Sequence, residues 1–336
     1  MKKIVLGFFV GACAASLFVV ASCFVGVQTA HAQVAAMVLQ SSGTTLQKTG
    51  QHLLSGQPAT GGYLGQCGFS SGNAAWVNYI GRQNSLGFDN VNQNVLGNPY
   101  DIDSYGIQLG TDLYRSRRSQ FGLLFDYEGF ITSLDGEDVM KSDNISAGFY
   151  YAQVFADNSD FRTLAKFGGA KHWAVDEVPR HKVDSDSFNA VFEYGKRYFP
   201  VQNISMRPYA AIDVNYVYLG ENEIAGVEFH STKLTQTYFR VGTDLIAQIR
   251  RFTVKTDISY SVDLASDRLD ITTHDVGGWV DDRLHIGRQI ASVGLSGQYD
   301  FNRCNAMFVG LGLDAFFDRD SRPYQSTVMA GFSHVW

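Results

Sequence analysis

The sequence holds histidines, a serine next to the histidine at position 230 and two acidic clusters, all of residue types that catalysis and metal binding use. Five histidines lie in or near expected loops, namely His172, His181, His230, His274 and His285. They lack the spacing of a metal site, and we interpret Ser231 beside His230 as a chance neighbour. Acidic residues gather at 135–138 and 281–282, where solvated loop tips are a commoner outcome than calcium ligands. The sequence therefore predicts no catalytic residue, metal or cofactor, and we expect a protein that is not an enzyme.

A further set of charged residues alternates with apolar residues along expected strands. In a sheet whose apolar face meets lipid, charges of the opposite parity point to the inner face. We expect the following residues to line a lumen: Arg82, Asp112, Asp126, Glu128, Glu193, Arg197, Arg207, Asp213, Arg240, Asp244, Lys255 and Asp257. Such a mixed set either faces water or holds a segment that plugs the lumen.

The elements that position these charges are twelve segments in which apolar and polar residues alternate with period 2. They lie at about 74–83, 102–114, 119–132, 143–155, 161–174, 185–198, 206–219, 234–247, 251–264, 287–301, 305–317 and 325–336. In the ninth, Phe252, Ile258 and Tyr260 face one way, whereas Lys255 and Asp257 face the other. A soluble sandwich would show the same period with its apolar face turned inward, so the lengths of the loops are needed to distinguish a sandwich from a membrane barrel.

The connections between these segments alternate in length. Short connections are expected near 115–118, 157–160, 200–205, 249–251 and 302–305, and longer ones near 84–101, 133–142, 175–184, 220–233 and 265–286. Short periplasmic turns and long outer loops are typical of outer-membrane barrels. The sequence thus predicts an all-β fold, a 12-stranded antiparallel transmembrane β-barrel, with a pore that holds about one helix, ~10 to 12 Å across.

The last segment, 325–336, is amphipathic and ends on an aromatic residue. Its apolar face carries the residues that we expect to act as an assembly signal: Val328, Ala330, Phe332 and Trp336. In a closed barrel the last strand pairs with the first, and a terminal aromatic residue can sit in the interfacial girdle. The alternative is an edge strand of a soluble sandwich.

The N-terminal part reads as a secretory signal peptide, residues 1–32. Two lysines precede an apolar stretch at 4–27, and Ala30-His31-Ala32 provides a small-x-small cleavage site. Residues 20–23 also resemble a lipoprotein cleavage box, but we favour cleavage after Ala32. Removing residues 1–32 takes away two lysines and no acidic residue, so the formal net charge of −6 becomes −8. An exported, mildly acidic chain argues against a nucleic-acid partner.

Residues 33–73 differ from the barrel segments that fill 74–336. An interrupted amphipathic pattern at 33–56 allows a short helix that would plug the pore, and a glycine-rich linker follows it. After signal cleavage only Cys67 and Cys304 remain. Because the periplasm is oxidising and both cysteines are expected near its rim, we predict a disulfide between them, the alternative being two unpaired thiols.

The barrel segments resemble the β-domain of bacterial autotransporters, the translocators of type V secretion, over about residues 75–336. The similarity is carried by WVNYIG at 76–81, YGIQLGTD at 105–112, RPYAA at 207–211, RVGTDL at 240–245 and the aromatic end. The resemblance implies a 12-stranded barrel whose pore is crossed by an N-terminal helix leading to an exported passenger. It implies the Sec translocon, the barrel-assembly machinery and outer-membrane lipid as partners.

The chain departs from that family in four respects. Only 41 residues separate Ala32 from Ala74, which is short for a passenger. Trp336 stands where the family usually ends in Phe, and His334 stands where an apolar residue is expected. No Asn-Asn pair occurs between Gln33 and Asn73, so self-cleavage is not supported. We expect an outer-membrane barrel that anchors or translocates an N-terminal segment; the alternatives are an adhesive surface barrel that uses its long loops and a small-solute pore.

Overall fold

The structure is a computed structural model, and it describes residues 74–86, 89–90, 100–116, 118–134, 136–175, 182–224, 227–265, 268–275, 278–285, 289–302, 304–317 and 324–335. Several predictions from the sequence lie outside these residues: the signal peptide and its cleavage after Ala32, the helix at 33–56 with its linker, Cys67 and Trp336. Within the described part of the chain, no helix is long and apolar enough to cross a membrane.

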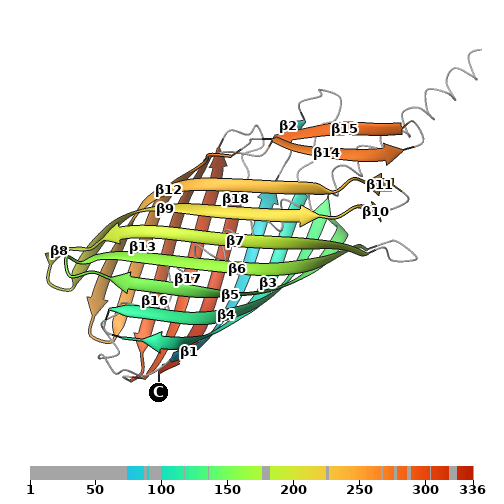
Figure 1. Ribbon diagram of the computed structural model, residues 1–336. Coiled ribbons are helices and arrows are strands. Elements are labelled where there is room, and N and C mark those ends of the chain that lie inside the picture. Colours follow the sequence, from blue (N-terminus) through green and yellow to red (C-terminus); the bar gives the residue numbers. More distant parts are fainter. Residues whose placement is uncertain are drawn as a thin grey trace, which may run out of the picture.

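Twelve long strands form the body of the part of the molecule that the structure describes (Figure 1). They are β1 (Ala74–Leu86), β3 (Tyr100–Arg115), β4 (Ser119–Leu134), β5 (Glu137–Val154), β6 (Ser159–Ala174), β7 (Lys182–Lys196), β9 (Ile204–Leu219), β12 (Thr232–Ile249), β13 (Phe252–Asp263), β16 (Gln289–Asp300), β17 (Asn305–Phe317) and β18 (Tyr324–Val335). Each overlaps one of the twelve segments predicted from the alternation of the sequence.

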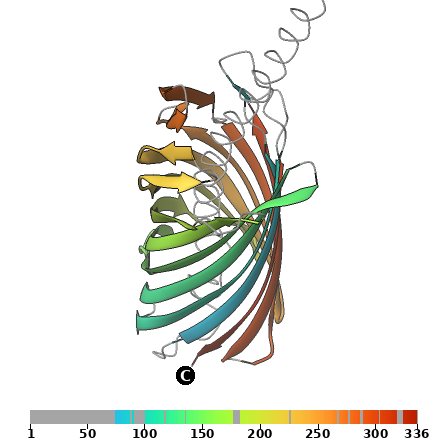
Figure 2. The same cartoon turned by 90° about the vertical axis from the view of Figure 1, so that its right-hand side faces the viewer.

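The sheet closes on itself, as the two views at right angles show (Figure 1, Figure 2). Each long strand pairs antiparallel with the next one, and β9 pairs with β12 across the connection that joins them. The last strand pairs antiparallel with the first, in a register that runs from Ala74 opposite Val335 to Ser85 opposite Tyr324. Closure satisfies the backbone groups of both strands, which would otherwise be free edges in lipid. The predicted 12-stranded antiparallel barrel is therefore confirmed.

The two faces of the wall differ as the alternation predicts. Along β17, Val309, Leu311 and Leu313 are exposed on the outside, whereas Gly310 and Asp314 are buried on the inside. Outward apolar side chains are therefore a property of the barrel wall that suits lipid, and the inner face takes the polar residues.

One end of the barrel carries short turns. Three of them contain a non-glycine residue in the left-handed region, namely Asn158 (φ 64°), Asn203 (φ 71°) and Arg250 (φ 56°). Asparagine tolerates this conformation better than most residues, which suits tight connections. The backbone N–H of Val335 donates to the carbonyl of Cys304 in the β16–β17 turn at 2.8 Å. The C-terminal end of β18 and the start of β1 therefore lie at the short-turn end.

The opposite end differs from the prediction in two respects. Residues 133–142 are not a long loop: β4 and β5 continue toward each other and meet at a turn in which Gly136 has φ 86°. The connections predicted at 84–101, 220–233 and 265–286 contain further strands, β2 (Asp89–Asn90), β10 (Asn222–Ile224), β11 (Val227–Phe229), β14 (Arg268–Asp275) and β15 (Gly278–His285). These form a separate five-stranded sheet in the order β10-β11-β14-β15-β2, beyond the barrel wall (Figure 1). A short strand that belongs to the barrel sheet, β8 (Tyr198–Val201), pairs with β9 at the short-turn end.

Candidate functional site

The inner face of the barrel concentrates the buried charged residues of the described chain around Arg207. Arg207 comes from β9 and is fully buried, with Nη1 2.7 Å from Glu193 Oε1 and 3.2 Å from Asp244 Oδ2. Its Nε donates to Asp160 Oδ2 at 2.8 Å. One guanidinium thus holds three carboxylates that come from β6, β7 and β12, which fits the fixed fork of donors that arginine provides.

A second guanidinium continues the network on β12. Arg240 lies with Nε 3.2 Å from Asp213 Oδ2 and Nη2 3.4 Å from Glu193 Oε2. Glu193 therefore bridges the two arginines. Next to them, Lys255 Nζ lies 2.8 Å from Asp244 Oδ1, which extends the chain of ion pairs to β13.

Tyr209 lies between the two guanidinium groups. Its ring centroid is 5.4 Å from the Arg207 guanidinium carbon and 5.2 Å from that of Arg240, within the range of cation–π contacts. Its hydroxyl donates to Asp257 Oδ2 at 2.7 Å and accepts from Arg240 Nη1 at 3.2 Å. A Cβ on Gly242 would lie 2.5 Å from the Tyr209 hydroxyl oxygen, so only glycine leaves room for the ring here.

A smaller group of ion pairs lies on the wall nearer to β1. Arg82 Nη1 is 2.7 Å from Glu128 Oε1, and Lys166 Nζ is 2.8 Å from Asp126 Oδ2. Asp126 also accepts from the Ser146 hydroxyl at 2.7 Å. Charges on the inner face are thus largely compensated in place, which lowers the cost of burying them.

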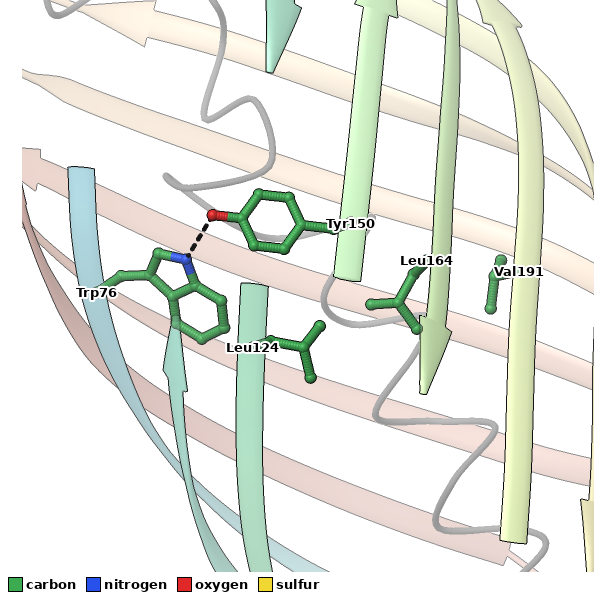
Figure 3. Packing of buried hydrophobic residues seen from close by; sticks show 5 residues of the cluster. All are labelled: Trp76, Leu124, Tyr150, Leu164 and Val191. Atoms are coloured by element: carbon green, nitrogen blue, oxygen red, sulfur yellow. Dashed lines mark hydrogen bonds between the residues drawn. The ribbon is translucent and has the colours of Figure 1, made fainter. Parts of the chain in front are cut away.

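An apolar belt crosses the inner face nearer to the short-turn end. It consists of Trp76, Leu124, Tyr150, Leu164 and Val191, all at most 4% exposed (Figure 3). The indole N–H of Trp76 donates to the Tyr150 hydroxyl at 3.3 Å, and that hydroxyl donates to Asp112 Oδ1 at 2.6 Å. The belt therefore ties β1 to β5 and anchors the carboxylate of Asp112.

Four side-chain amides on the wall around the β1–β18 seam are buried and, among the residues that the structure describes, have no hydrogen-bond partner for either polar atom. They are Asn78, Asn84, Gln108 and Gln325. Asn78 lies opposite Gln108 on β3, and Asn84 lies opposite Gln325 on β18. An amide offers two N–H donors and a carbonyl acceptor, so this wall can bond both kinds of polar group.

The structure places the charged residues expected in the lumen as follows. Nine are buried members of the ion-pair and hydrogen-bond groups above, namely Arg82, Asp112, Asp126, Glu128, Glu193, Arg207, Asp213, Arg240 and Asp244. Lys255 is buried and Asp257 half-buried in the same network. Arg197 is half-buried in the connection between β7 and β8, where its backbone N–H donates to the backbone carbonyl of Asn158 at 2.9 Å.

Three buried charges in these networks were missing from the sequence prediction: Asp160, Arg162 and Lys166. Asp160 was assigned to a turn, but β6 begins at Ser159. Arg162 and Lys166 share their parity with Leu164, which obscured the polar face of this strand. Arg162 and Lys166 also share their parity with His172, and this polar set was the signal that could have revealed them. His172 bonds to Ser142 at 2.7 Å and to Ser185 at 2.8 Å. His172, which was expected in or near a loop, lies buried within β6, two residues before the strand ends at Ala174.

The other predicted sites lie in the β16–β17 turn and along β18. Cys304 is exposed in the β16–β17 turn, where its N–H donates to Asn302 Oδ1 at 2.8 Å. Its expected partner Cys67 lies outside the described residues. Val328, Ala330 and Phe332 are exposed on the outer face of β18, and Trp336 is outside the described residues.

A closed antiparallel barrel with an apolar outer wall and an ion-paired inner wall is the architecture of an outer-membrane β-barrel. A family model described as the autotransporter β-domain matches residues 75–312. Since this match spans more than half of the chain, the chain belongs to the autotransporter β-domain family. The barrel is thus of the translocator type, and its place is the outer membrane.

Solved structures of similar fold support the barrel architecture. The transport unit of the autotransporter AIDA-I from Escherichia coli is 11% identical with a TM-score of 0.65, over 88% of this chain and 98% of that chain. The translocator domain of NalP from Neisseria meningitidis is 9% identical with a TM-score of 0.58, over 91% and 98%. The β-domain of the Bordetella autotransporter BrkA is 14% identical with a TM-score of 0.56, over 79% and 99%. Identities this low show the fold alone. A comparison with curated protein sequences found no match.

Proposed function

We propose that the barrel anchors or translocates an N-terminal segment of its own chain across the outer membrane. The observation that carries the proposal is the position of the first strand. Ala74 begins β1 opposite Val335, at the end with the short turns, and its side chain is buried on the inner face. A segment that precedes Ala74 therefore joins the barrel at the periplasmic opening of the lumen.

The inner wall beside this strand supports the proposal. The amides of Asn78, Gln108, Asn84 and Gln325, which have no partner within the described part of the chain, lie on β1 and its two neighbours, β3 and β18. A polypeptide carries one N–H donor and one carbonyl acceptor at almost every residue, and a buried amide gains from bonding either. Such a wall suits a chain of varied sequence, because amides recognise the backbone without selecting a charge.

Biogenesis of such a protein involves further steps that we include in the proposal. The signal peptide directs the chain to the Sec translocon and is cut after Ala32, and the barrel-assembly machinery inserts the barrel through its last strand. Residues 33–56 then form a helix that plugs the pore. A disulfide from Cys67 to Cys304 fixes the linker at the rim.

Conductance in planar bilayers tests the plug and the translocation pathway together. The mature protein, residues 33–336, is compared with a variant that lacks residues 33–56. We expect the deletion to raise the single-channel conductance, because it removes the segment from the lumen. Equal conductance of both forms would overturn the proposal that this segment occupies the lumen. A variant that lacks an outer hairpin, residues 268–285, serves as a matched control for the loss of chain and should conduct like the parent.

The five-stranded sheet at the long-loop end favours a second candidate function, adhesion. Strands β14 and β15 pair over eight residues each, and β11 and β2 extend the sheet on both sides. An ordered sheet beyond the wall offers a stable surface to a partner, as outer loops of barrels do. If adhesion is the function, deletion of residues 268–285 abolishes binding of expressing cells to their target surface and leaves conductance unchanged; unaltered binding would reject it.

A further inference from the structure

The outer wall of the barrel has a groove near the long-loop end, across β4, β5, β6 and β7. Its volume is about 710 Å³. Its charged lining comes from Asp143, Lys171, Lys182, Asp184 and Asp186, and Trp173 also lines it. Lys171, Lys182, Asp184 and Asp186 are exposed, and Asp143 and Trp173 are half-buried. The groove is separate from the lumen, because these side chains share the outward parity of their strands.

The groove exists because Gly169 replaces a side chain in the middle of the wall. Gly169 lies between Ile145 on β5 and Asp186 on β7 in the strand register. A Cβ built on Gly169 would lie 3.4 Å from the Ser185 carbonyl oxygen and 3.7 Å from Asp186 Oδ1, which is ordinary contact. A larger residue at this position would therefore fill the groove without displacing the wall.

The groove begins where the apolar band of the wall ends. Phe167 and Phe188 are opposite each other on β6 and β7, with ring centroids 4.9 Å apart, and Phe167 is 61% exposed. Lys171 follows Phe167 by four residues, about 13 Å along the strand. Aromatic residues mark the interface between acyl chains and headgroups in membrane barrels. The charged lining thus lies at the level of lipid headgroups.

The charges alternate in sign across neighbouring strands. Lys171 is opposite Asp143 on one side and Asp184 on the other, and Lys182 is opposite Trp173 in the next row. Within the described residues, neither lysine forms an ion pair with these aspartates. Tyr127 donates its hydroxyl to Asp143 Oδ1 at 2.7 Å, which fixes that carboxylate in the groove. Two cations and three anions give the lining a net charge of −1.

We propose that this groove binds the zwitterionic headgroup of a membrane lipid, one that carries both a phosphate and an ammonium group. Lys171 and Lys182 hold the phosphate, since ammonium groups bind phosphate as point charges. Asp143, Asp184 and the face of Trp173 hold the ammonium group, by ion pairing and a cation–π contact. A purely anionic headgroup would meet three carboxylates, so the net charge of the lining selects the zwitterion.

Lipid retention tests the site in the full mature chain. The protein is placed in nanodiscs with equal amounts of phosphatidylethanolamine and phosphatidylglycerol. Native mass spectrometry then counts the lipids that stay bound to the protein after it is released from the nanodisc. We expect the parent to retain phosphatidylethanolamine about tenfold over phosphatidylglycerol. Gly169→Leu should abolish this preference. Gly81→Leu is the matched control, because a Cβ on Gly81 meets only Tyr79 Cε1, at 4.0 Å, on the outer face of β1; it should behave like the parent.

Charge variants separate the headgroup contact from apolar contact. Lys171→Gln and Asp184→Asn should each lower the preference, and both variants should still migrate as folded barrels on unheated gels. Parent-like preference in both, or equal retention of the two lipids by the parent, would overturn the proposal. Loss of the lipid on chelation of divalent cations would instead show an ion-bridged phosphate and would equally overturn it. Displacement of the lipid by millimolar soluble glycerophosphoethanolamine would overturn the assignment to a lipid rather than to a free zwitterion.

Discussion

Arg207 Nη1 lies 2.7 Å from Glu193 Oε1, and both side chains are buried on the inner wall. The same guanidinium also bonds Asp160 and Asp244. Ion pairs of this kind join β6, β7, β9 and β12, four strands that follow one another around the wall. Because taking one partner from a buried network leaves uncompensated charge, the pairs should matter more to stability than exposed pairs do.

Arg207→Leu should therefore destabilise the barrel by about 3 to 5 kcal/mol. The free energy of unfolding is measured by urea titration of the protein in lipid vesicles, followed by tryptophan fluorescence. Lys196→Ala is the control. Lys196 Nζ lies 3.2 Å from Asp157 Oδ2, so it also forms an ion pair with a carboxylate, but the two side chains are 43% and 56% exposed. That variant should lose much less stability, because solvent screens an exposed ion pair. Equal losses in the two variants would contradict the importance of the inner network.

Removal of residues 332–336 should prevent insertion of the barrel into the outer membrane. The register of β18 with β1 pairs Phe332 with Val77 and Val335 with Ala74, so the deletion opens the seam at the short-turn end. The test is migration on unheated and heated SDS gels, since a closed barrel resists detergent and migrates faster unheated. Phe332→Ala, which keeps the backbone pairing, should be affected less. A heat-modifiable, surface-exposed truncation would refute this expectation.

The disulfide between Cys67 and Cys304 is a prediction about the linker. Cys304 is exposed at the same end as Ala74, since its carbonyl accepts from Val335 N–H at 2.8 Å and Val335 pairs with Ala74. The bond would close a loop of over two hundred residues and add about 4 to 5 kcal/mol in the chain-entropy model. Mass spectrometry of the alkylated, unreduced mature protein should show no blocked cysteine; two blocked cysteines would exclude the bond.

Asp157, in the β5–β6 turn, should titrate at unusually low pH. Hydrogen bonds from the Ser159 hydroxyl and N–H, at 2.6 and 3.2 Å, and from Lys196 hold the pKa of Asp157 at about 2, below its ordinary 3.8. Because the folded pKa is the lower one, the ionised carboxylate stabilises the turn above about pH 4, and this contribution disappears as the pH falls through 2.

Carbon-13 titration of the Asp157 carboxyl group in detergent micelles gives this midpoint directly. Ser159→Ala removes the hydroxyl donor and should move the midpoint toward the ordinary value. Lys196→Ala should move it less, because the serine bonds are the larger cause. A midpoint near 4 in the unmodified protein would contradict the turn geometry.

The alternation of the sequence, together with the alternating loop lengths, was sufficient to predict the barrel, because both can be read from local stretches of the chain. It was insufficient at residues 133–142, where Gly136 and its acidic neighbours read as a loop although the strands continue to a tight turn. Polar residues such as Ser133 and Asp138 occupy both strands beside this turn, so the alternation that marks a strand disappears there.

Which side chains contact each other on the inner wall could not be predicted from the sequence either. Parity assigned Glu193 and Arg240 to the inner face, but their contact depends on strand register and on side-chain reach across β9. Trp76 and Tyr150 are 74 residues apart and bond because the curved sheet brings β1 and β5 together across β3 and β4. The room for Tyr209 beside Gly242 likewise follows from the register of β9 and β12. Such contacts belong to the closed sheet rather than to any single strand.

Surface exposure of the N-terminal segment tests the translocator account most directly. An epitope tag is inserted after Gln33 of the full chain, and intact cells are probed with an antibody before and after the outer membrane is permeabilised. A heat-modifiable band confirms in each case that the barrel is folded. The account predicts that the tag is bound on intact cells; a tag that becomes accessible only after permeabilisation, on a folded barrel, would contradict it.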